Sequence, residues 1–382
     1  MRLRGFTAAA ILVAGALTLH APAGRAAPAY GPRLILATGI GAGYDSNLLQ
    51  YSDEQLQLFE SGTRPDEFSI QTRDDAVWTP FLALTLEQRR SGSRRRSLRL
   101  RGDGDFHAKN STADYHSVGA VWREGLGGGR RLQLSYYLLP NYYLRQLFDA
   151  TAIVPYRGLS KYRRAELRLQ IAGANWSQRL GHSGVLSGDY RFEHRRYNPA
   201  FDERTSGTSQ AVGQFVFDRL PHHGSVLVNA GYRTCNARAG DTIDPATGSP
   251  VLNADVGYHG LVTRLAGSTE LARRRGLQLN ATIAYELETR DFTSAVPTDR
   301  YHYRRKDLLN AGEAEVRLGL RRHWTIRGTG RTEFNRAKLG VALPATSSGD
   351  AGSYRESQAA LAIEWSGNLW RGDRAGNSGD EP

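Results

Sequence analysis

The sequence predicts an all-β fold: a transmembrane antiparallel up-and-down β-barrel of about 14 strands, within a range of about 12 to 16. Three observations support it: a leader typical of exported proteins, stretches of alternating hydrophobicity, and polar connections that are short and long in strict alternation. Because a bilayer offers no water to the backbone, an exported chain of this kind has few alternatives to a closed barrel. The short connections are then expected to be periplasmic turns and the long ones extracellular loops.

Residues 1–26 are interpreted as a cleavable secretory signal peptide. Arg2 and Arg4 give a positive start, and an apolar stretch runs from Phe6 to Leu19. That stretch is shorter than the roughly 20 apolar residues that a membrane-spanning helix needs. Small residues suited to cleavage follow at 21–23 and again at 24–26. The alternative is an anchor that stays attached; lipid anchoring is not expected, because no Cys lies near the cleavage region.

The composition is compatible with a barrel although it is polar. Mean hydropathy is -0.49 and charged residues make up 23% of the chain. In a barrel such values are expected, because only every second residue of a strand faces lipid. The chain has 42 Gly and 18 Tyr against a single Met, which suits strands, turns and interfacial aromatic side chains better than a helical core.

Cysteine usage and charge narrow the possible partners. Cys235 is the single cysteine, so neither a disulfide framework nor a cysteine-based metal site is expected. The formal net charge of +12 would suggest nucleic acid in a cytosolic protein. In an exported barrel we interpret it as an arginine-rich lumen and loops that face anionic lipid or polysaccharide, with no nucleic-acid partner.

The alternation is clearest in two segments separated by the turn 91–93. In both, apolar residues occupy every second position, a period that is typical of a strand and not of a helix. The predicted outward residues of the first segment are Trp78, Pro80, Leu82, Leu84 and Leu86. Those of the second are Leu98, Leu100, Gly102, Gly104 and Phe106, with Arg99, Arg101, Asp103, Asp105 and His107 facing inward.

The connections divide the chain into an even number of strands, with both termini on the short-turn side. The further short turns are expected at 125–129, 181–184, 221–224, 273–276 and 321–323. The long connections are expected at 48–75, 146–158, 198–207, 240–257, 292–304 and 340–352, with a shorter outer one at 110–111. We expect the barrel to cover residues 30–370 as one domain, followed by a polar periplasmic tail, 371–382.

Charged residues on the inward faces form the candidate site. An Arg or Lys that faces lipid at mid-membrane costs about 2–4 kcal/mol, so these charges should line a hydrated lumen or pair with one another. The residues expected to line the lumen and set selectivity are Arg99, Arg101, Asp103, Asp105, Glu166, Arg168, Glu313, Glu315, Arg317, Arg327 and Arg331. Because Arg outnumbers the acids, a preference for anions is expected. In the alternative, Arg–carboxylate pairs only brace adjacent strands and plug the barrel.

Enzymatic activity is not expected. A hydrolytic barrel needs a nucleophile or acid pair beside an oriented His at the outer rim. No Ser or Asp spacing singles out one of the histidines that could reach the rim, which are His107, His116, His259 and His302. The pair His222-His223 could bind a metal ion, but adjacent histidines in a turn are more often solvated. We therefore expect no catalytic residue, metal site or cofactor.

The glycine-rich run Gly39-Ile40-Gly41-Ala42-Gly43 would indicate a phosphate-binding loop only if a helix followed, and Tyr44-Asp45-Ser46-Asn47 does not begin one. In a strand, such glycines leave room for large side chains on the neighbouring strands. The strand that contains them is expected at 33–47.

A resemblance rests on three short motifs within residues 43–84. These are Gly43-Tyr44-Asp45-Ser46-Asn47-Leu48, Asp66-Glu67-Phe68 and Thr79-Pro80-Phe81-Leu82-Ala83-Leu84. The segment resembles porin-like outer-membrane β-barrel proteins whose first strand ends in Gly-Tyr-Asp-Ser-Asn. Some of these occur with exopolysaccharide export, and a similar motif opens the barrel of surface-lipoprotein assembly modifiers. The resemblance implies an outer-membrane barrel and leaves its cargo open.

The chain departs from this pattern in two places. No helical-repeat domain precedes the barrel, which argues against the lipoprotein-translocating type. Outer-membrane barrels also usually finish on an aromatic residue that the assembly machinery recognises. Here the polar stretch 371–382 follows the last outward face, which is Ala359, Leu361, Ile363 and Trp365.

The sequence thus predicts a bacterial outer-membrane barrel acting as a passive, porin-like channel for small polar or anionic solutes, saccharides among them. The alternative is a non-conducting structural or secretion-accessory barrel associated with exopolysaccharide or surface-polymer export. The expected partners are outer-membrane lipid, lipopolysaccharide, the barrel-assembly machinery and the solute or polysaccharide. A monomer is expected, because trimeric porins usually have more strands. The solute, the gating and whether the lumen is open or plugged do not follow from the sequence.

Overall fold

The computed structural model describes residues 31–89, 94–148, 162–238, 256–294, 302–320, 323–340 and 352–371. The expected signal peptide, 1–26, and residues 372–382 of the expected tail lie outside these ranges. The strands are β1 (Arg33–Asp45), β2 (Asp75–Arg89), β3 (Arg95–His107), β4 (Tyr115–Gly127), β5 (Arg130–Phe148), β6 (Tyr162–Leu180), β7 (Gly184–Tyr197), β8 (Ser206–Leu220), β9 (Gly224–Ala237), β10 (Tyr258–Arg274), β11 (Leu277–Phe292), β12 (Lys306–Leu320), β13 (Trp324–Lys338) and β14 (Tyr354–Arg371).

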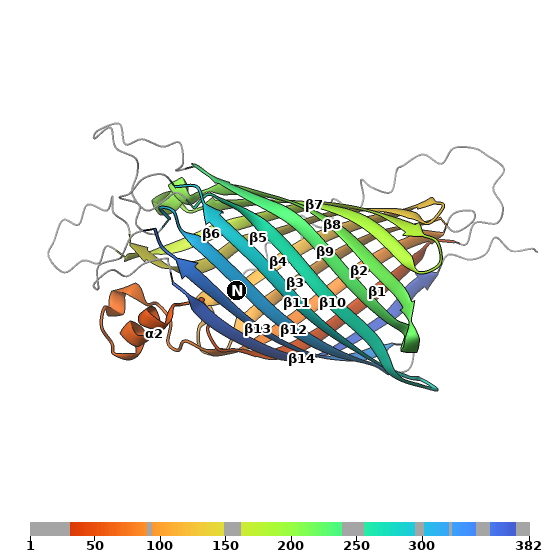
Figure 1. The fold of residues 1–382 in the computed structure, drawn as a ribbon. Coiled ribbons are helices and arrows are strands. Elements are labelled where there is room, and N and C mark those ends of the chain that lie inside the picture. Colours follow the sequence, from red (N-terminus) through yellow and green to blue (C-terminus); the bar gives the residue numbers. More distant parts are fainter. Residues whose placement is uncertain are drawn as a thin grey trace, which may run out of the picture.

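The strands form one closed antiparallel barrel (Figure 1). Each strand pairs with its neighbours in the chain, and β1 closes the ring against β14, from Arg33 opposite Arg371 to Asp45 opposite Gln358. Closure gives every strand a partner strand on both sides, which is the condition for a sheet to lie in a bilayer. The predicted all-β up-and-down barrel of 14 strands is confirmed.

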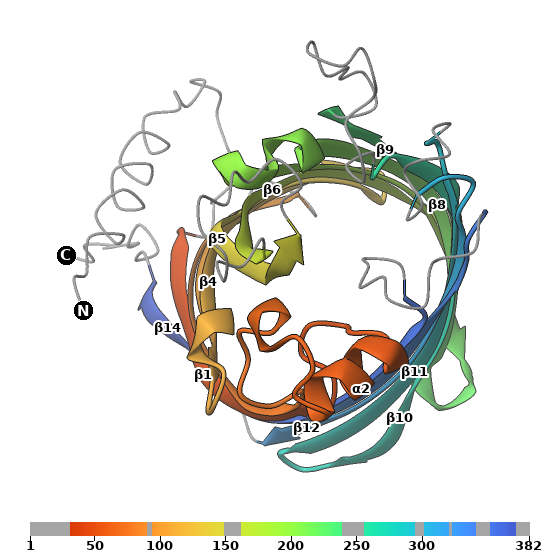
Figure 2. The ribbon, with the colours of Figure 1, turned by 90° about the vertical axis from the view of Figure 1, so that its left-hand side faces the viewer.

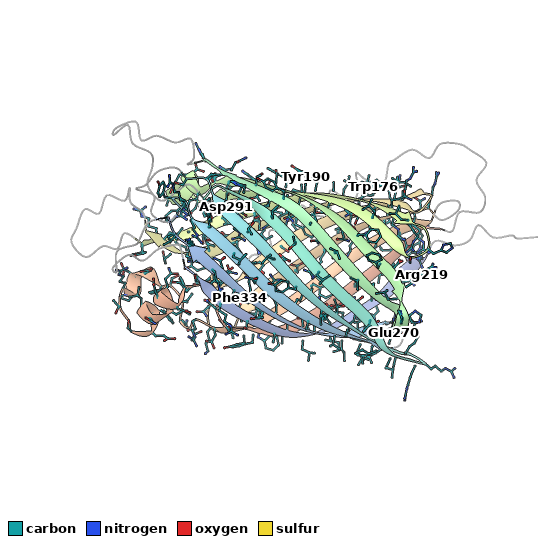
Figure 3. The ribbon with its side chains drawn as sticks, in the orientation of Figure 1. Trp176, Tyr190, Arg219, Glu270, Asp291 and Phe334 are labelled. Atoms are coloured by element: carbon teal, nitrogen blue, oxygen red, sulfur yellow. The ribbon has the colours of Figure 1, made fainter. Side chains whose placement is uncertain are left out.

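Side chains alternate between the two faces of the wall as the sequence indicated. Residues directly opposite each other on paired strands share a face, so Leu82 and its partner Gly102 lie on the same side. On that side Trp78 is 50% exposed and Leu82 46% exposed, whereas Ala83, the residue after Leu82, is buried. Figure 3 shows Trp176 and Tyr190 on the outer surface of the barrel. Large exposed apolar side chains thus form a lipid-facing belt around the closed wall.

The strand ends that the long connections join lie at one end of the barrel, and those that the short turns join lie at the other (Figure 1). Parts of several long connections fall outside the described residues. The first long loop, residues 46–74, contains α2 (Asp53–Glu60), which begins with a capping box between Ser52 and Gln55. Among the described helices, none has the length and apolar character needed to cross a membrane.

The expectation that residues 48–75 form only a polar loop is wrong in part. Besides α2, the loop contributes an apolar core of Leu49, Tyr51, Phe68 and Ile70. Leu49 and Tyr51 lie far in sequence from Phe68 and Ile70, so no single local period connects the two pairs and the pattern did not indicate a shared core. Figure 2, which views the barrel from this end, shows the loop and α2 within the outline of the ring, over part of its opening.

The alternation predicts how the wall responds to an added charge. We expect Ile283→Arg on β11 to lower the free energy of unfolding by about 2–4 kcal/mol, because Ile283 is 68% exposed on the lipid-facing side. The neighbouring substitution Thr282→Arg points into the barrel and should cost less. Urea unfolding in phospholipid vesicles measures both. Equal losses for the two variants would contradict the assigned faces.

Candidate pore and extracellular mouth

The inner wall carries ion pairs that run from strand to strand. Arg264 on β10 lies 3.5 Å from Glu286 on β11 and 3.2 Å from Glu313 on β12. On the next strands, Arg327 lies 3.9 Å from Glu315 and 3.2 Å from Glu364. Each arginine therefore bridges acids on two other strands, and these carboxylates are already compensated.

Two sites on the inner wall place one carboxylate between two arginines. Glu288 lies 2.7 Å from both Arg233 and Arg290. On β7, Glu193 lies 3.2 Å from Arg191 and 2.6 Å from Arg195. The two arginines beside each carboxylate offset the cost of its desolvation. Each triad keeps a net charge of +1, so the pairing does not neutralise the wall.

The inner face of β3 and β4 is also basic. Arg101 pairs with Asp103 at 2.8 Å and lies 4.5 Å above the centre of the Phe81 ring. Arg123 donates to Gln133 at 2.7 Å. Arg99 lies between them on the same face and, within the described part of the chain, forms no ion pair. This face therefore offers positive charge that its own acids do not fully compensate.

The register shows where each predicted lumen residue points. The residues on the inner face are Arg99, Arg101, Asp103, Asp105, Glu313, Glu315, Arg317, Arg327 and Arg331. Asp103 accepts a hydrogen bond from Ser117, and Asp105 accepts one from Tyr115. Arg331 pairs with Glu333, and Arg317 with Glu315. Their effect on selectivity remains a prediction.

The predicted inward positions of Glu166 and Arg168 are wrong. The β6–β7 register runs without a shift from Leu167 to Leu180, so Arg168 shares the outward face of Trp176, which is 42% exposed. Glu166 has the same parity and pairs with Arg164. The apolar residues between them are buried instead, in a cluster with Tyr197 and Phe201. Near the end of the barrel that carries the long loops, the apolar side chains of β6 pack against the loop after β7. An apolar side chain at this end is therefore not necessarily lipid-facing.

The two triads are lumen groups that the predicted selectivity set does not include. The signal was present: Asp189, Arg191, Glu193 and Arg195 alternate with Tyr190 and Phe192, which are exposed on the outer face. What the pattern could not show is that Arg233 and Glu288, which lie far apart in sequence, meet across β10.

Water reaches the charged groups at mid-depth of the barrel. The side chain of Arg191 is 43% exposed and that of Arg101 is 37% exposed, although both face inward on a closed wall. Arg264 and Arg331, on the other side, are 32% and 33% exposed. Such exposure inside a closed barrel requires water-sized space beside these side chains.

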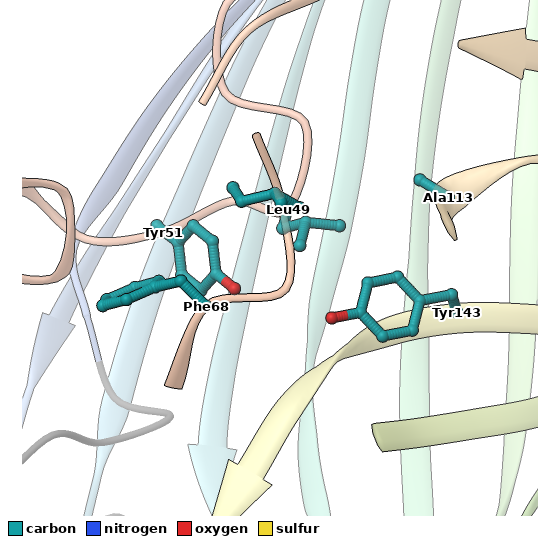
Figure 4. Close-up of a cluster of buried hydrophobic side chains, with 6 residues drawn as sticks. Leu49, Tyr51, Phe68, Ala113 and Tyr143 are labelled. Carbon is teal, nitrogen blue, oxygen red and sulfur yellow. The ribbon is translucent and has the colours of Figure 1, made fainter. Parts of the chain in front are cut away.

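The extracellular mouth is narrowed by the first loop, which packs on β5 (Figure 4). Tyr51 is 1% exposed and makes an edge-on contact with Phe68, with ring centres 5.3 Å apart. Arg145 on β5 lies 5.1 Å above the Tyr51 ring and donates to the Leu49 carbonyl at 2.7 Å. Burial raises the pKa of the Tyr51 phenol. The loop therefore has its own core and is not a free polar segment.

The Gly-Tyr-Asp-Ser-Asn segment anchors this loop to the seam of the barrel. Tyr44 donates to Asp74 at 2.7 Å, a hydrogen bond that holds the pKa of Asp74 below its usual range. Asp45 accepts from the Asn47 backbone at 2.9 Å, and the Asn47 amide donates to the carbonyls of Tyr51 and Arg355. The motif thus fastens the loop to both β1 and β14.

Two histidines that could reach the rim are held in local contacts. The Nδ1 atom of His107 lies 3.2 Å from Asp114, and His302 is buried and stacked on Phe292. Among the described residues, no group of three or more His, Cys, Asp or Glu side chains is placed to hold a metal ion.

A closed wall with a lipid-facing apolar belt and a hydrated, charged interior defines a transmembrane β-barrel of the outer-membrane class. No protein-family model matches the chain, and no curated protein matches it.

Similar solved structures are outer-membrane proteins of very different sequence. A bacterial polysaccharide outer-membrane secretin matches with 10% identity and a TM-score of 0.43, over 87% of this chain and 98% of the other. The channel DcaP of Acinetobacter baumannii matches with 11% identity and a TM-score of 0.42, over 88% and 98%. An anion-selective porin from Comamonas acidovorans matches with 10% identity and a TM-score of 0.38, over 88% and 99%.

The apolar core of the first loop predicts that the loop detaches from the barrel when this core is disrupted. Tyr51→Ala removes a buried ring, and truncations of this kind cost about 3–5 kcal/mol. We expect the loop to detach while the barrel stays folded, so limited proteolysis should cut within residues 46–74 much faster than in the parent protein. The matched control is Tyr232→Ala, which removes a lipid-facing ring that is 47% exposed. If both variants were cut at the parental rate, the loop core would not hold the loop.

Proposed function

We propose that the protein is a passive outer-membrane channel for small polar or anionic solutes, saccharides among them. The observation that carries this proposal is the partial exposure of inward-facing arginines, such as Arg101 and Arg191, at mid-depth of the closed wall. A plugged barrel would bury these groups in dry pairs. The proposal includes no catalytic role.

The charge on the wall supports a preference for anions. The two Arg–Glu–Arg triads and the β3–β4 face each carry more positive than negative charge. In a narrow passage with low-dielectric walls, such an excess attracts anions and repels cations. Arginine also binds carboxylates and phosphates with two parallel hydrogen bonds, which favours small acidic solutes.

The number of strands in the barrel supports passage of small solutes. Barrels of about 8 strands are filled by their own side chains, whereas those of about 16 to 18 leave a wide aqueous channel. A ring of 14 strands, narrowed at the mouth by a packed loop, lies between these cases. We therefore infer a passage for single small molecules and not for folded proteins. A monomer and assembly by the barrel-assembly machinery remain predictions.

The proposal is tested by the reversal potential of the refolded barrel in a planar bilayer under a KCl gradient. The parent protein should give stable conductance with a preference for chloride. Arg99→Ser with Arg101→Ser should shift the reversal potential towards cations, because it removes two inner-wall charges. The matched control is Arg168→Ser with Arg196→Ser, which removes two outward charges and should leave it unchanged.

Unchanged selectivity in the Arg99/Arg101 variant would exclude these residues as its source. A folded, heat-modifiable barrel that passes no current would exclude the channel itself. That outcome would favour the second candidate, a non-conducting accessory barrel associated with surface-polymer export. Two observations favour this candidate: the packed loop at the mouth and the resemblance of residues 43–48 to barrels of that kind.

A further inference from the structure

Four cationic side chains gather on the lipid-facing side of β12, β13 and β14, at the end that carries the long loops. They are exposed and come from three adjacent strands: Lys306, Arg336, Lys338 and Arg355. The register places Lys306 directly opposite Lys338, and Arg336 opposite Leu308. Arg355 lies opposite Phe334 on the last pair of strands.

This arrangement is unfavourable without an anion. Residues directly opposite each other on paired strands have Cβ atoms about 4.5–5.5 Å apart, and like charges in such pairs destabilise the sheet. Lys306 has one carboxylate nearby, that of Asp291 at 3.2 Å. Within the described part of the chain, Arg336, Lys338 and Arg355 form no ion pair.

The acids of the same strands are directed away from this cluster. Asp307 and Glu333 point into the barrel, where they pair with Arg305 and Arg331 at 2.6 Å each. Glu356 also faces inward and accepts from Gln50 and Gln358. On β12, β13 and β14 these carboxylates thus lie inside and the cationic cluster outside, and Asp291 of β11 is the acid beside the cluster.

The cluster lies at the upper edge of the apolar belt. Leu308 and Phe334, at the adjacent outward positions on the same strands, are each 37% exposed. Figure 3 shows Phe334 and Asp291 towards the end of the barrel that carries α2. Aromatic side chains usually mark the membrane interface in such barrels. The cations are thus placed where the head groups of the outer leaflet begin.

We propose that this cluster is a binding site for the phosphate groups of an anionic glycolipid of the outer leaflet, lipopolysaccharide. The guanidinium groups of Arg336 and Arg355 bind phosphate oxygens with parallel hydrogen bonds, and the lysines add point charges. Phe334 and Leu308 contact the sugar and the upper acyl chains. The site lies outside the lumen and does not depend on conduction.

The test measures lipopolysaccharide binding to the detergent-purified barrel by native mass spectrometry. We expect Arg336→Gln with Lys338→Gln to weaken binding about 30-fold, since each basic residue near an anionic lipid surface contributes about 1 kcal/mol. The matched control is Arg274→Gln with Arg275→Gln, which removes two exposed cations from the short-turn end and should leave binding unchanged. Heat modifiability on gels confirms that each variant is folded.

Two further probes distinguish the phosphate groups of lipopolysaccharide from free phosphate as the bound anion. Dephosphorylated lipopolysaccharide should bind the parent barrel as weakly as the phosphorylated form binds the Arg336/Lys338 variant. Free pyrophosphate should bind far more weakly than lipopolysaccharide. The proposal is overturned if that variant binds like the parent protein, if removing the phosphates has no effect, or if pyrophosphate binds as tightly as the glycolipid. If the first double variant fails to fold, Lys306→Gln with Arg355→Gln replaces it with the same expectation.

Discussion

The structure depends on one constraint, the cost of leaving a backbone amide or carbonyl unpaired where there is no water. A strand cannot satisfy these groups alone, so every strand needs two neighbours and the first must find the last. The pairing of β1 with β14 along its whole length meets this requirement. Closure in turn fixes two faces for every strand, one towards lipid and one towards the interior. The other features of the molecule follow from how side chains use these faces.

On the inner face, the same scarcity of water determines how charges are arranged. A lone buried carboxylate is costly, so many acids of the wall lie beside an arginine, and others, such as Asp105 and Glu356, accept hydrogen bonds from neutral side chains. Because the chain places two arginines around Glu193 and two around Glu288, pairing satisfies the acids and still leaves positive charge. Bracing of the wall and a positive lumen are therefore compatible.

The sequence was sufficient to predict the direction of a side chain where the side chain contacts only lipid or only the lumen. The period of two in β2 and β3 predicted their faces, and nine of the eleven predicted lumen positions point inward by the register, all except Glu166 and Arg168. The sequence was insufficient where a side chain packs against a loop, which is neither lipid nor lumen. Near the mouth, Leu167 packs against loop residues and not lipid, which reversed the assignment of β6. The core around Tyr51 joins segments that no local period connects.

The glycines of β1, the strand that closes the barrel, also affect where charged side chains lie in the lumen. They were expected to leave room for large neighbours, and a Cβ on Gly39 would lie 2.6 Å from the ring of Phe81, its direct partner on β2. The ring occupies that space, and Arg101 lies over it at 4.5 Å. Glycine at position 39 therefore leaves free the space that the ring below Arg101 occupies. A larger residue at position 39 would displace the ring and, with it, one of the charges that line the basic side of the lumen.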